Sequence, residues 1–185
     1  NPFNGGFSVF AGIETLLDTI VDFRFSEDDI EYLKEQKIFE QGFLDYLKDF
    51  KFTGDLYSMA EGTVIFPQEP LVRIHAKLIE AQILEGLVLN FINFQSLIAT
   101  KTSRIWLASK KAPIMEFGLR RAQGPSGAMV ATRAAYIGGA AGTSNTLAGK
   151  LYGIPVMGTM AHSWIMSHSS ELEAFREYAK IYPQN

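Results

Sequence analysis

The stretch Pro113-Ile-Met-Glu-Phe-Gly-Leu-Arg120 begins a regular alternation of β-type and helical segments that continues to the end of the chain. Its side chains alternate as expected of a strand, and a helical pattern follows each β-type segment. This alternation is typical of βαβ units on a parallel sheet, so the predicted fold class is α/β. The expected elements are strands over 113–119, 137–143 and 154–160, and helices over 126–136, 145–152 and 171–182.

The chain before residue 110 has a different pattern and is predicted to form an α+β domain with long buried helices. From Ala76 the apolar positions cover too wide a face for a surface helix, so this helix is expected to be largely buried, with a further helix reaching about Ser109. Ser26 and Ser170 are expected to begin helices through capping boxes. The other expected elements are a strand over 7–11, helices around 13–20, 30–33 and 43–47, and an antiparallel meander of 56–59, 63–66 and 71–75.

The predicted domains are therefore 1–110, the α+β domain, and 111–185, the first βα units of an incomplete α/β barrel. An eight-stranded βα barrel needs about 250 residues, and the βα units here are too few to close one. We therefore expect this chain to be a piece of a longer protein.

Composition excludes several classes of protein. The chain has 185 residues, a hydrophobic fraction of 47% and a net charge of −3, which fits a globular protein and argues against nucleic-acid binding through bulk charge. It has no cysteine, so disulfides and Cys-based zinc sites are excluded, and a reducing compartment is favoured. The three histidines lack metal-ligand spacing. The longest uncharged apolar stretch, 86–100, is shorter than the roughly 18 residues of a membrane-spanning helix, and no signal peptide is expected.

Charged residues in the strand from Pro113 mark the first candidate site. Glu116, Gly118 and Arg120 are expected on one face, with Arg120 and Arg121 at the carboxyl end of the strand, where α/β proteins bind ligands. Arginine forks suit phosphate or carboxylate. The alternative is a buried structural pair of Glu116 with Arg120.

Two further motifs are candidates for the same site. In Gly142-Thr-Ser-Asn145, either Ser144 or Asn145 is expected to cap the following helix. The free backbone N–H groups at this helix end are then available to bind an anion, or else the motif is simply a good N-cap after a flexible loop. In Gly158-Thr-Met-Ala-His-Ser163, Thr159 and His162 are expected near Arg120, where the histidine is an acid, base or nucleophile, or else a satisfied structural residue. His75 and His168 have no comparable context.

The segments 116–124, 142–149 and 153–163 resemble, in order and spacing, three successive motifs of the nicotinate phosphoribosyltransferases. The segments 1–7 and 90–100 are also similar to that family, so the resemblance covers the whole chain.

The resemblance implies an N-terminal α+β domain followed by part of an irregular, type II phosphoribosyltransferase α/β barrel. It implies an enzyme of NAD salvage that joins nicotinate to phosphoribosyl pyrophosphate, giving nicotinate mononucleotide and pyrophosphate. ATP and Mg²⁺ are the implied cofactors, with ATP hydrolysis coupled through a phosphorylated histidine. The complete enzyme is expected to be a cytoplasmic homodimer with small-molecule substrates and no nucleic-acid or membrane partner.

The resemblance also implies roles for individual residues. His162 corresponds to the phosphorylated histidine. Phe117 matches an aromatic residue that, in the related nicotinamide enzymes, stacks on the pyridine ring. Arg120, with Arg121 beside it, matches an arginine at the phosphoribosyl and base site. Thr159 matches a nicotinate contact.

Ser144 bears on the choice of substrate. Related nicotinamide enzymes carry an aspartate at this position, which would repel the carboxylate of nicotinate, whereas a serine hydroxyl can donate to it. The alternatives are a quinolinate or nicotinamide phosphoribosyltransferase of the same fold, or a non-catalytic binding or scaffold relative. Family members are more than twice as long and carry further substrate-binding residues, so this chain alone is expected to be inactive.

Overall fold

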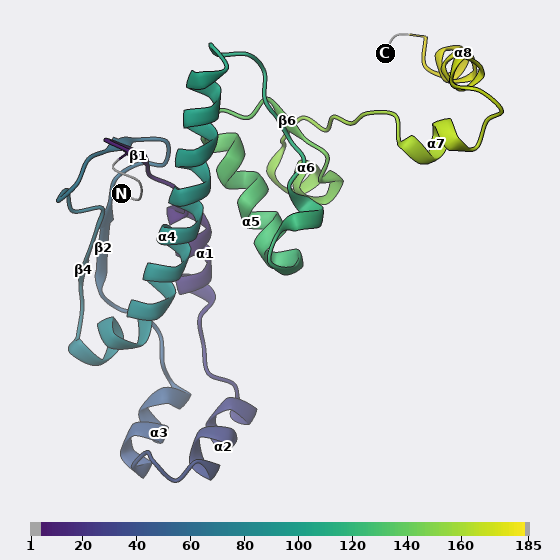
Figure 1. Ribbon diagram of the computed structural model, residues 1–185. Helices are drawn as coiled ribbons and strands as arrows, with labels where there is room; N and C mark the ends of the chain where they lie inside the picture. The colour runs from purple at the N-terminus through teal and green to yellow at the C-terminus, as the bar shows by residue number, and fades with distance from the viewer. Residues whose placement is uncertain (1–4, 184–185) are drawn as a thin grey trace.

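Helix α4 (Leu78–Ala108) runs through the centre of the structure, and most other elements are arranged around it (Figure 1). The computed structural model describes residues 5–183, so the first four residues of the predicted family segment 1–7 lie outside it. Helix α1 (Ile13–Asp22) and strand β1 (Ser8–Val9) contact α4, and so does helix α5 (Gly124–Ile137) from the second half of the chain. One long helix thus joins the two halves.

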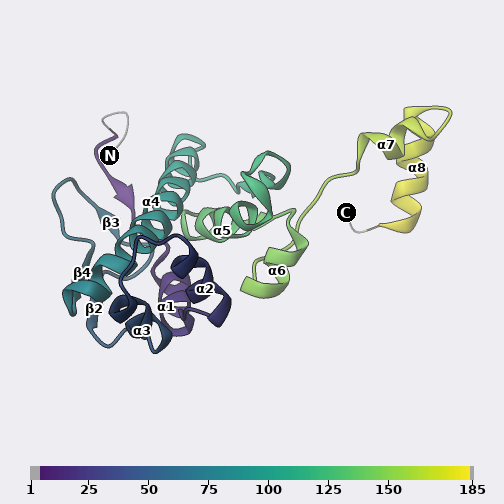
Figure 2. The ribbon, with the colours of Figure 1, turned by 90° about the horizontal axis from the view of Figure 1, so that it is seen from below.

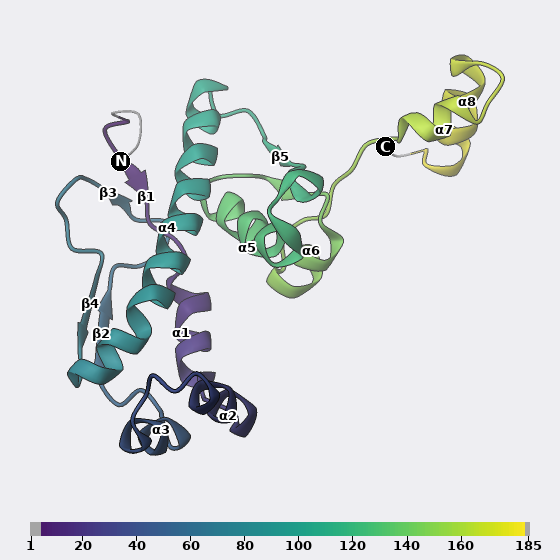
Figure 3. The ribbon, with the colours of Figure 1, turned by 60° about the horizontal axis from the view of Figure 1, so that its bottom comes forward.

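The three helices predicted near the N-terminus are confirmed. They are α1, α2 (Glu27–Glu35) and α3 (Gln41–Lys48), and Figure 3 shows α2 and α3 together below the end of α1. The capping box at Ser26 is complete, because its hydroxyl accepts from the Asp29 N–H at 3.2 Å and its own N–H donates to the Asp29 carboxylate at 2.8 Å. These hydrogen bonds hold the pKa of Asp29 below its ordinary value.

The predicted antiparallel meander is wrong. Strand β2 (Asp55–Ser58) pairs with β4 (Val72–His75), whereas β3 (Val64–Ile65) pairs with β1, both antiparallel. The Gly62 N–H donates to the Phe10 carbonyl at 2.8 Å, and the Phe10 N–H donates to the Thr63 carbonyl at 2.9 Å. The chain therefore crosses to the N-terminal strand after Gly62 instead of folding back on β2.

Helix α4 differs from the prediction in two ways. It is one continuous helix of 31 residues, and it is buried along one side only. Leu84 and Ile92 lie in the core, whereas Leu78 is 80% and Leu89 61% exposed. The apolar pattern predicts a largely buried helix, but the described residues leave one side of it exposed.

By length and composition alone, α4 is the one helix within residues 5–183 that could cross a membrane, although its uncharged stretch 86–100 is shorter than the roughly 18 residues expected of such a helix. Its contacts are those of a core helix. Glu80 is buried and accepts from the backbone N–H and the hydroxyl of Thr53, at 2.8 and 2.9 Å.

The alternation of strand and helix in the second half is confirmed, but the strands are shorter than predicted. Strands β5 and β6 pair in parallel, with Glu116 opposite Thr143, and a single parallel bridge joins Thr143 to Val156. The helix that begins at His162 was not predicted. The elements are β5 (Met115–Glu116), the 3₁₀ turn η2 (Leu119–Arg121), α5, β6 (Gly142–Thr143), α6 (Thr146–Tyr152), α7 (His162–Met166) and α8 (Glu171–Ile181).

Helices α7 and α8 pack on each other and project away from the rest of the chain (Figure 2). The Trp164 indole N–H donates to the Ala174 carbonyl at 3.0 Å. Ser170 caps α8 as predicted, accepting from the Glu173 N–H at 3.2 Å. The return hydrogen bond predicted for that capping box, from the Ser170 N–H to the Glu173 carboxylate, is wrong. The Glu173 carboxylate accepts instead from the Ser169 hydroxyl.

An ion-pair cluster joins α5 to the N-terminal half. The Arg133 guanidinium donates to the Glu61 carboxylate at 2.6 Å and to Glu14 at 2.5 Å, and the side chains of Arg133 and Glu61 are 12% and 8% exposed. Glu61 also accepts from the Gly12 N–H at 2.6 Å. Burial opposes the charge on Glu61, but the hydrogen bonds from Arg133 and Gly12 outweigh it and lower the pKa of this carboxyl.

Replacing Arg133 with methionine is expected to lower the free energy of unfolding by about 2 to 3 kcal/mol, because it leaves Glu61 buried without its cation. Urea unfolding of the purified protein measures this difference. Glu14→Gln is the control, since Glu14 is 71% exposed and its pair should contribute less than about 1 kcal/mol.

The same experiment has a defined pH dependence. The pKa of Glu61 is lowered in the folded protein. The ion pair of Glu61 with Arg133 therefore contributes fully to the free energy of unfolding above the unfolded pKa, near 4.5, and this contribution declines as the pH falls toward the folded pKa. An Arg133→Met effect equal to that of Glu14→Gln, or one that does not decline in acid, would contradict this assignment.

Candidate active site

One open cavity of about 570 Å³ brings together segments that are far apart in the sequence. Its walls come from the β5–η2 turn, from the loop between β6 and α6, and from the segment that leads into α7. Five of the six predicted site residues line it, namely Phe117, Arg120, Ser144, Thr159 and His162.

The β5–η2 turn places Phe117 and Arg120 in this cavity. The predicted strand ends at Glu116, and Gly118 has helical backbone angles (φ −79°, ψ −9°) that turn the chain into η2. The predicted alternation of Glu116, Gly118 and Arg120 on one strand face is therefore wrong. Arg120 instead lies on the 3₁₀ turn and is exposed, and Phe117 is 42% exposed.

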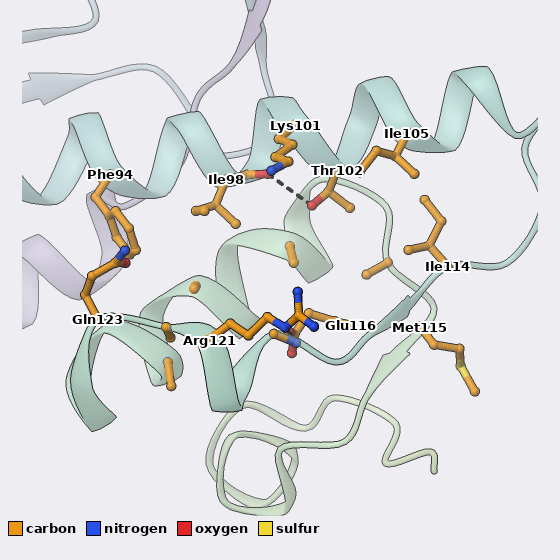
Figure 4. Close-up of a pocket in the computed structure, with 16 residues that line it drawn as sticks. Phe94, Ile98, Lys101, Thr102, Ile105, Ile114, Met115, Glu116, Arg121 and Gln123 are labelled. Atoms are coloured by element: carbon orange, nitrogen blue, oxygen red, sulfur yellow. Dashed lines mark hydrogen bonds between the residues drawn. The ribbon is translucent and has the colours of Figure 1, made fainter. Parts of the chain in front are cut away.

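Arg121 lies in a different place. It lines a second cavity of about 460 Å³ between α4, α5 and β5, and Figure 4 shows its side chain reaching into that cavity. Lys101 of α4 and Glu116 line the same cavity. Arg120 and Arg121 are thus neighbours in sequence that line two different cavities, so their side chains do not share one site.

The alternative in which Glu116 pairs with Arg120 is also wrong, since no ion pair joins them in the part of the chain that the structure describes. Glu116 is half-buried, and its carboxylate accepts from the Gly118 N–H at 2.5 Å. It also accepts from the hydroxyls of Thr132, at 2.9 Å, and Thr143, at 2.7 Å. The sequence analysis missed both threonines, because their link to Glu116 crosses 16 and 27 residues of chain.

Asn145, rather than Ser144, caps α6. The Asn145 side-chain oxygen accepts from the Ala148 N–H at 3.2 Å. The exposed Ser144 side chain is therefore available to the cavity, while its backbone N–H donates to the Glu116 carbonyl at 3.1 Å. The predicted helix end at residue 152 is confirmed, and Gly153 follows it in the left-handed conformation.

Thr159 and His162 reach the cavity from a segment that is mostly not a strand. Parallel pairing in this region is limited to the bridge at Val156, and His162 is the first residue of α7 and is exposed. His168 makes a 2.7 Å hydrogen bond with the Trp164 carbonyl, and His75 is exposed on β4, so both lie outside the cavity.

The chemistry of the cavity lining favours an anionic ligand. Arg120 is its one permanently charged residue among those described, and the hydroxyl-bearing residues Ser144, Thr159 and Ser163 line it together with His162. Aspartate and glutamate are absent from this described lining. Within residues 5–183, no group of three or more His, Cys, Asp or Glu side chains could hold a metal ion.

Comparison with family models gives two matches. The nicotinate phosphoribosyltransferase N-terminal domain matches residues 1–93, and the nicotinate phosphoribosyltransferase family matches residues 112–181. The chain is 44% identical over 182 residues to a nicotinate phosphoribosyltransferase of Mycobacterium tuberculosis, covering 98% of this chain and 39% of that relative. It is 43% identical over 181 residues to the Bacillus subtilis protein of the same name, covering 98% and 37%.

Solved structures agree with the fold. Human nicotinic acid phosphoribosyltransferase aligns with a TM-score of 0.82 at 35% identity, over 91% of this chain and 34% of that one. A nicotinate-nucleotide pyrophosphorylase from Pyrococcus furiosus aligns with a TM-score of 0.77 at 26% identity, over 97% and 39%. The chain thus spans between a third and two fifths of the length of these relatives. Because the N-terminal domain model covers half of it and the family model most of the remainder, the chain belongs to the nicotinate phosphoribosyltransferase family.

Proposed function

We propose that the complete protein containing this chain is a nicotinate phosphoribosyltransferase of NAD salvage. It would convert nicotinate and phosphoribosyl pyrophosphate to nicotinate mononucleotide and pyrophosphate. The observation that carries this proposal is the single cavity in which Phe117, Arg120, Ser144, Thr159 and His162 meet. The names of the relatives, at 43 and 44% identity, support it.

In the proposed reaction the ring nitrogen of nicotinate forms a bond to C1 of the ribose. The bond from C1 to the pyrophosphate oxygen breaks, and its electron pair leaves with pyrophosphate. Positive charge develops at C1, so the protein has mainly to position the reactants and stabilise charge. Phe117 would stack on the pyridine ring, Ser144 and Thr159 would contact nicotinate, and Arg120 would bind phosphate or carboxylate oxygens.

His162 is the proposed site of ATP coupling. A nitrogen of its exposed imidazole would attack the γ-phosphorus of ATP, the bond to the β-phosphate oxygen would break, and ADP would leave. Later attack by water would release phosphate and restore the histidine. A phosphoryl group on His162 would add negative charge to the cavity that Arg120 lines. This added charge would alter the binding of phosphate at Arg120.

The described residues do not form a resident magnesium site, because they hold no suitable carboxylate cluster. We therefore propose that Mg²⁺ enters with the phosphates of its substrates, and no residue of this chain is assigned to it. Arg121 is proposed to act from the second cavity rather than beside Arg120. The division into domains 1–110 and 111–185, a homodimeric assembly and a cytoplasmic location complete the proposal.

Two other functions are separable by experiment. A quinolinate or nicotinamide phosphoribosyltransferase would turn over its own base in preference to nicotinate, and Ser144 argues against nicotinamide. A non-catalytic scaffold would turn over none of the three. Measuring nucleotide formation by the complete protein with each base distinguishes these outcomes.

Ser144→Asp in the complete protein is expected to lower kcat/KM for nicotinate by about 100-fold or more, because it brings a like charge close to the carboxylate in a partly desolvated cavity. Ser58→Asp adds the same charge at an exposed position on β2 and should leave turnover unchanged. Normal kcat/KM in the Ser144 variant would show that this residue does not face the carboxylate.

Arg120→Lys is expected to lower kcat/KM at least about tenfold, since a lysine lacks the planar fork of the guanidinium. The melting temperature should hardly change, because Arg120 is exposed. Arg176→Lys, at an exposed position on α8, is the matched control. Normal kinetics together with a lower melting temperature would instead make Arg120 a structural residue.

His162→Ala is expected to abolish transfer of the labelled γ-phosphate of ATP to the protein, while slow ATP-independent synthesis of nicotinate mononucleotide continues. The label on the wild-type protein should survive alkali and be lost in acid, as a phosphoramidate does. His75→Ala should retain the label in full. Label that persists in His162→Ala would show that another residue is modified, and robust labelling of residues 1–185 alone would contradict the expected inactivity of this part.

A further inference from the structure

The Glu116 carboxylate joins three separate segments directly behind the wall of the active-site cavity. One oxygen accepts from the Gly118 N–H in the β5–η2 turn. The other accepts from the hydroxyls of Thr132 on α5 and Thr143 on β6. Glu116 itself lines the cavity on the α4 side, as Figure 4 shows, and not the cavity of the proposed active site.

The direction of each hydrogen bond in this network is fixed by its donors. The Thr143 hydroxyl oxygen accepts from the Asn145 N–H at 2.9 Å, and the Thr132 oxygen accepts from the Asn145 side-chain amide at 3.4 Å. Each hydroxyl has a single proton, and each directs it to Glu116. Both threonine hydroxyls therefore donate to Glu116, whose carboxyl oxygens act as the acceptors at the end of the network.

Water cannot readily replace these contacts. Thr132, Thr143 and Asn145 are 1%, 0% and 3% exposed. A donor left without an acceptor at such a depth is costly, so the network holds its members in one arrangement.

The network also spans two of the three segments that carry the proposed substrate contacts. Gly118 lies between Phe117 and Arg120 in sequence, and Thr143 and Asn145 flank Ser144 on either side. The Ser144 N–H adds a backbone bond to the Glu116 carbonyl at 3.1 Å. Glu116 is thus bonded next to three of the proposed substrate contacts, Phe117, Arg120 and Ser144, without being one of them.

We propose that Glu116 is a positioning residue that fixes the Phe117–Arg120 turn relative to Ser144, and so sets the spacing between the groups that hold the pyridine ring, the phosphate and the carboxylate. This inference rests on the proposed function. Catalytic groups must be held within about 0.5 Å of their working positions, and a 1 Å misplacement costs about 100-fold in rate.

The test compares Glu116→Gln with Glu80→Gln in the complete protein. A glutamine at 116 keeps only one acceptor oxygen, so its NH₂ group has to face either the Gly118 N–H or the two threonine hydroxyls. In either orientation a donor meets a donor, and at least one hydrogen bond of the network is lost. Glu80 is buried and likewise accepts from a backbone N–H and a threonine hydroxyl, both of Thr53, but it lies on the N-terminal part of α4, where Lys77 is 3.5 Å away. The two variants therefore make the same chemical change at and away from the active site.

Glu116→Gln is expected to lower kcat/KM for nicotinate at least about tenfold, with a raised KM, whereas Glu80→Gln should stay within about twofold of wild type. Both variants should lower the melting temperature. Thr143→Ser, which keeps the hydroxyl, should retain most of the activity that Thr143→Val loses.

Amide hydrogen exchange provides a readout that does not depend on turnover. Segments 117–121 and 143–146 should exchange faster in Glu116→Gln than in wild type and Glu80→Gln. Unchanged exchange, or faster exchange with kcat/KM within twofold of wild type, would overturn the positioning role. If the wild-type protein does not use nicotinate, the proposed function fails, and exchange alone then decides whether Glu116 anchors these segments.

Discussion

The close approach of α4 and α5 is the constraint on which the two halves of this structure depend. A Cβ atom at Gly138 would lie 2.3 Å from the Ala99 carbonyl oxygen, so the helices meet backbone to backbone at this point. Two consecutive residues of α5 then connect in different directions. Arg133 binds Glu61 in the N-terminal half, and Thr132 binds Glu116 beside the active-site cavity. The position of α5 against α4 therefore locates the cavity wall relative to the rest of the fold.

The helices could be predicted well from the sequence because their signals are local. Apolar spacing and the caps at Ser26, Ser170 and Gly153 mark their positions without reference to distant residues. Strand partners could not be predicted in the same way, since alternation shows that a segment is extended but not which segment it pairs with. The pairing of β3 with β1 depends on backbone bonds between Phe10 and residues 62 and 63, far along the chain.

The candidate site shows the same division between local and distant information. The three motifs place five predicted residues in one cavity, because each motif lies in a loop that follows a β segment. The location predicted for Arg121 was wrong because the strand ends at Glu116 and a 3₁₀ turn follows. Successive side chains on this turn point in different directions, so Arg120 and Arg121 line different cavities. The partners of Glu116 could not be foreseen, since buried threonines carry no sequence signal for a distant carboxylate.

The cap of α6 has a consequence for how specificity can evolve in this fold. Folding of the loop relies on Asn145, which caps the helix and bonds to the buried threonines, whereas the neighbouring Ser144 presents an exposed side chain to the cavity. The residue that maintains the loop and the residue proposed to select the base are thus adjacent but separate. A single codon change at 144 can alter the chemistry offered to a substrate without removing the cap, so preference for the base can drift while the scaffold stays intact.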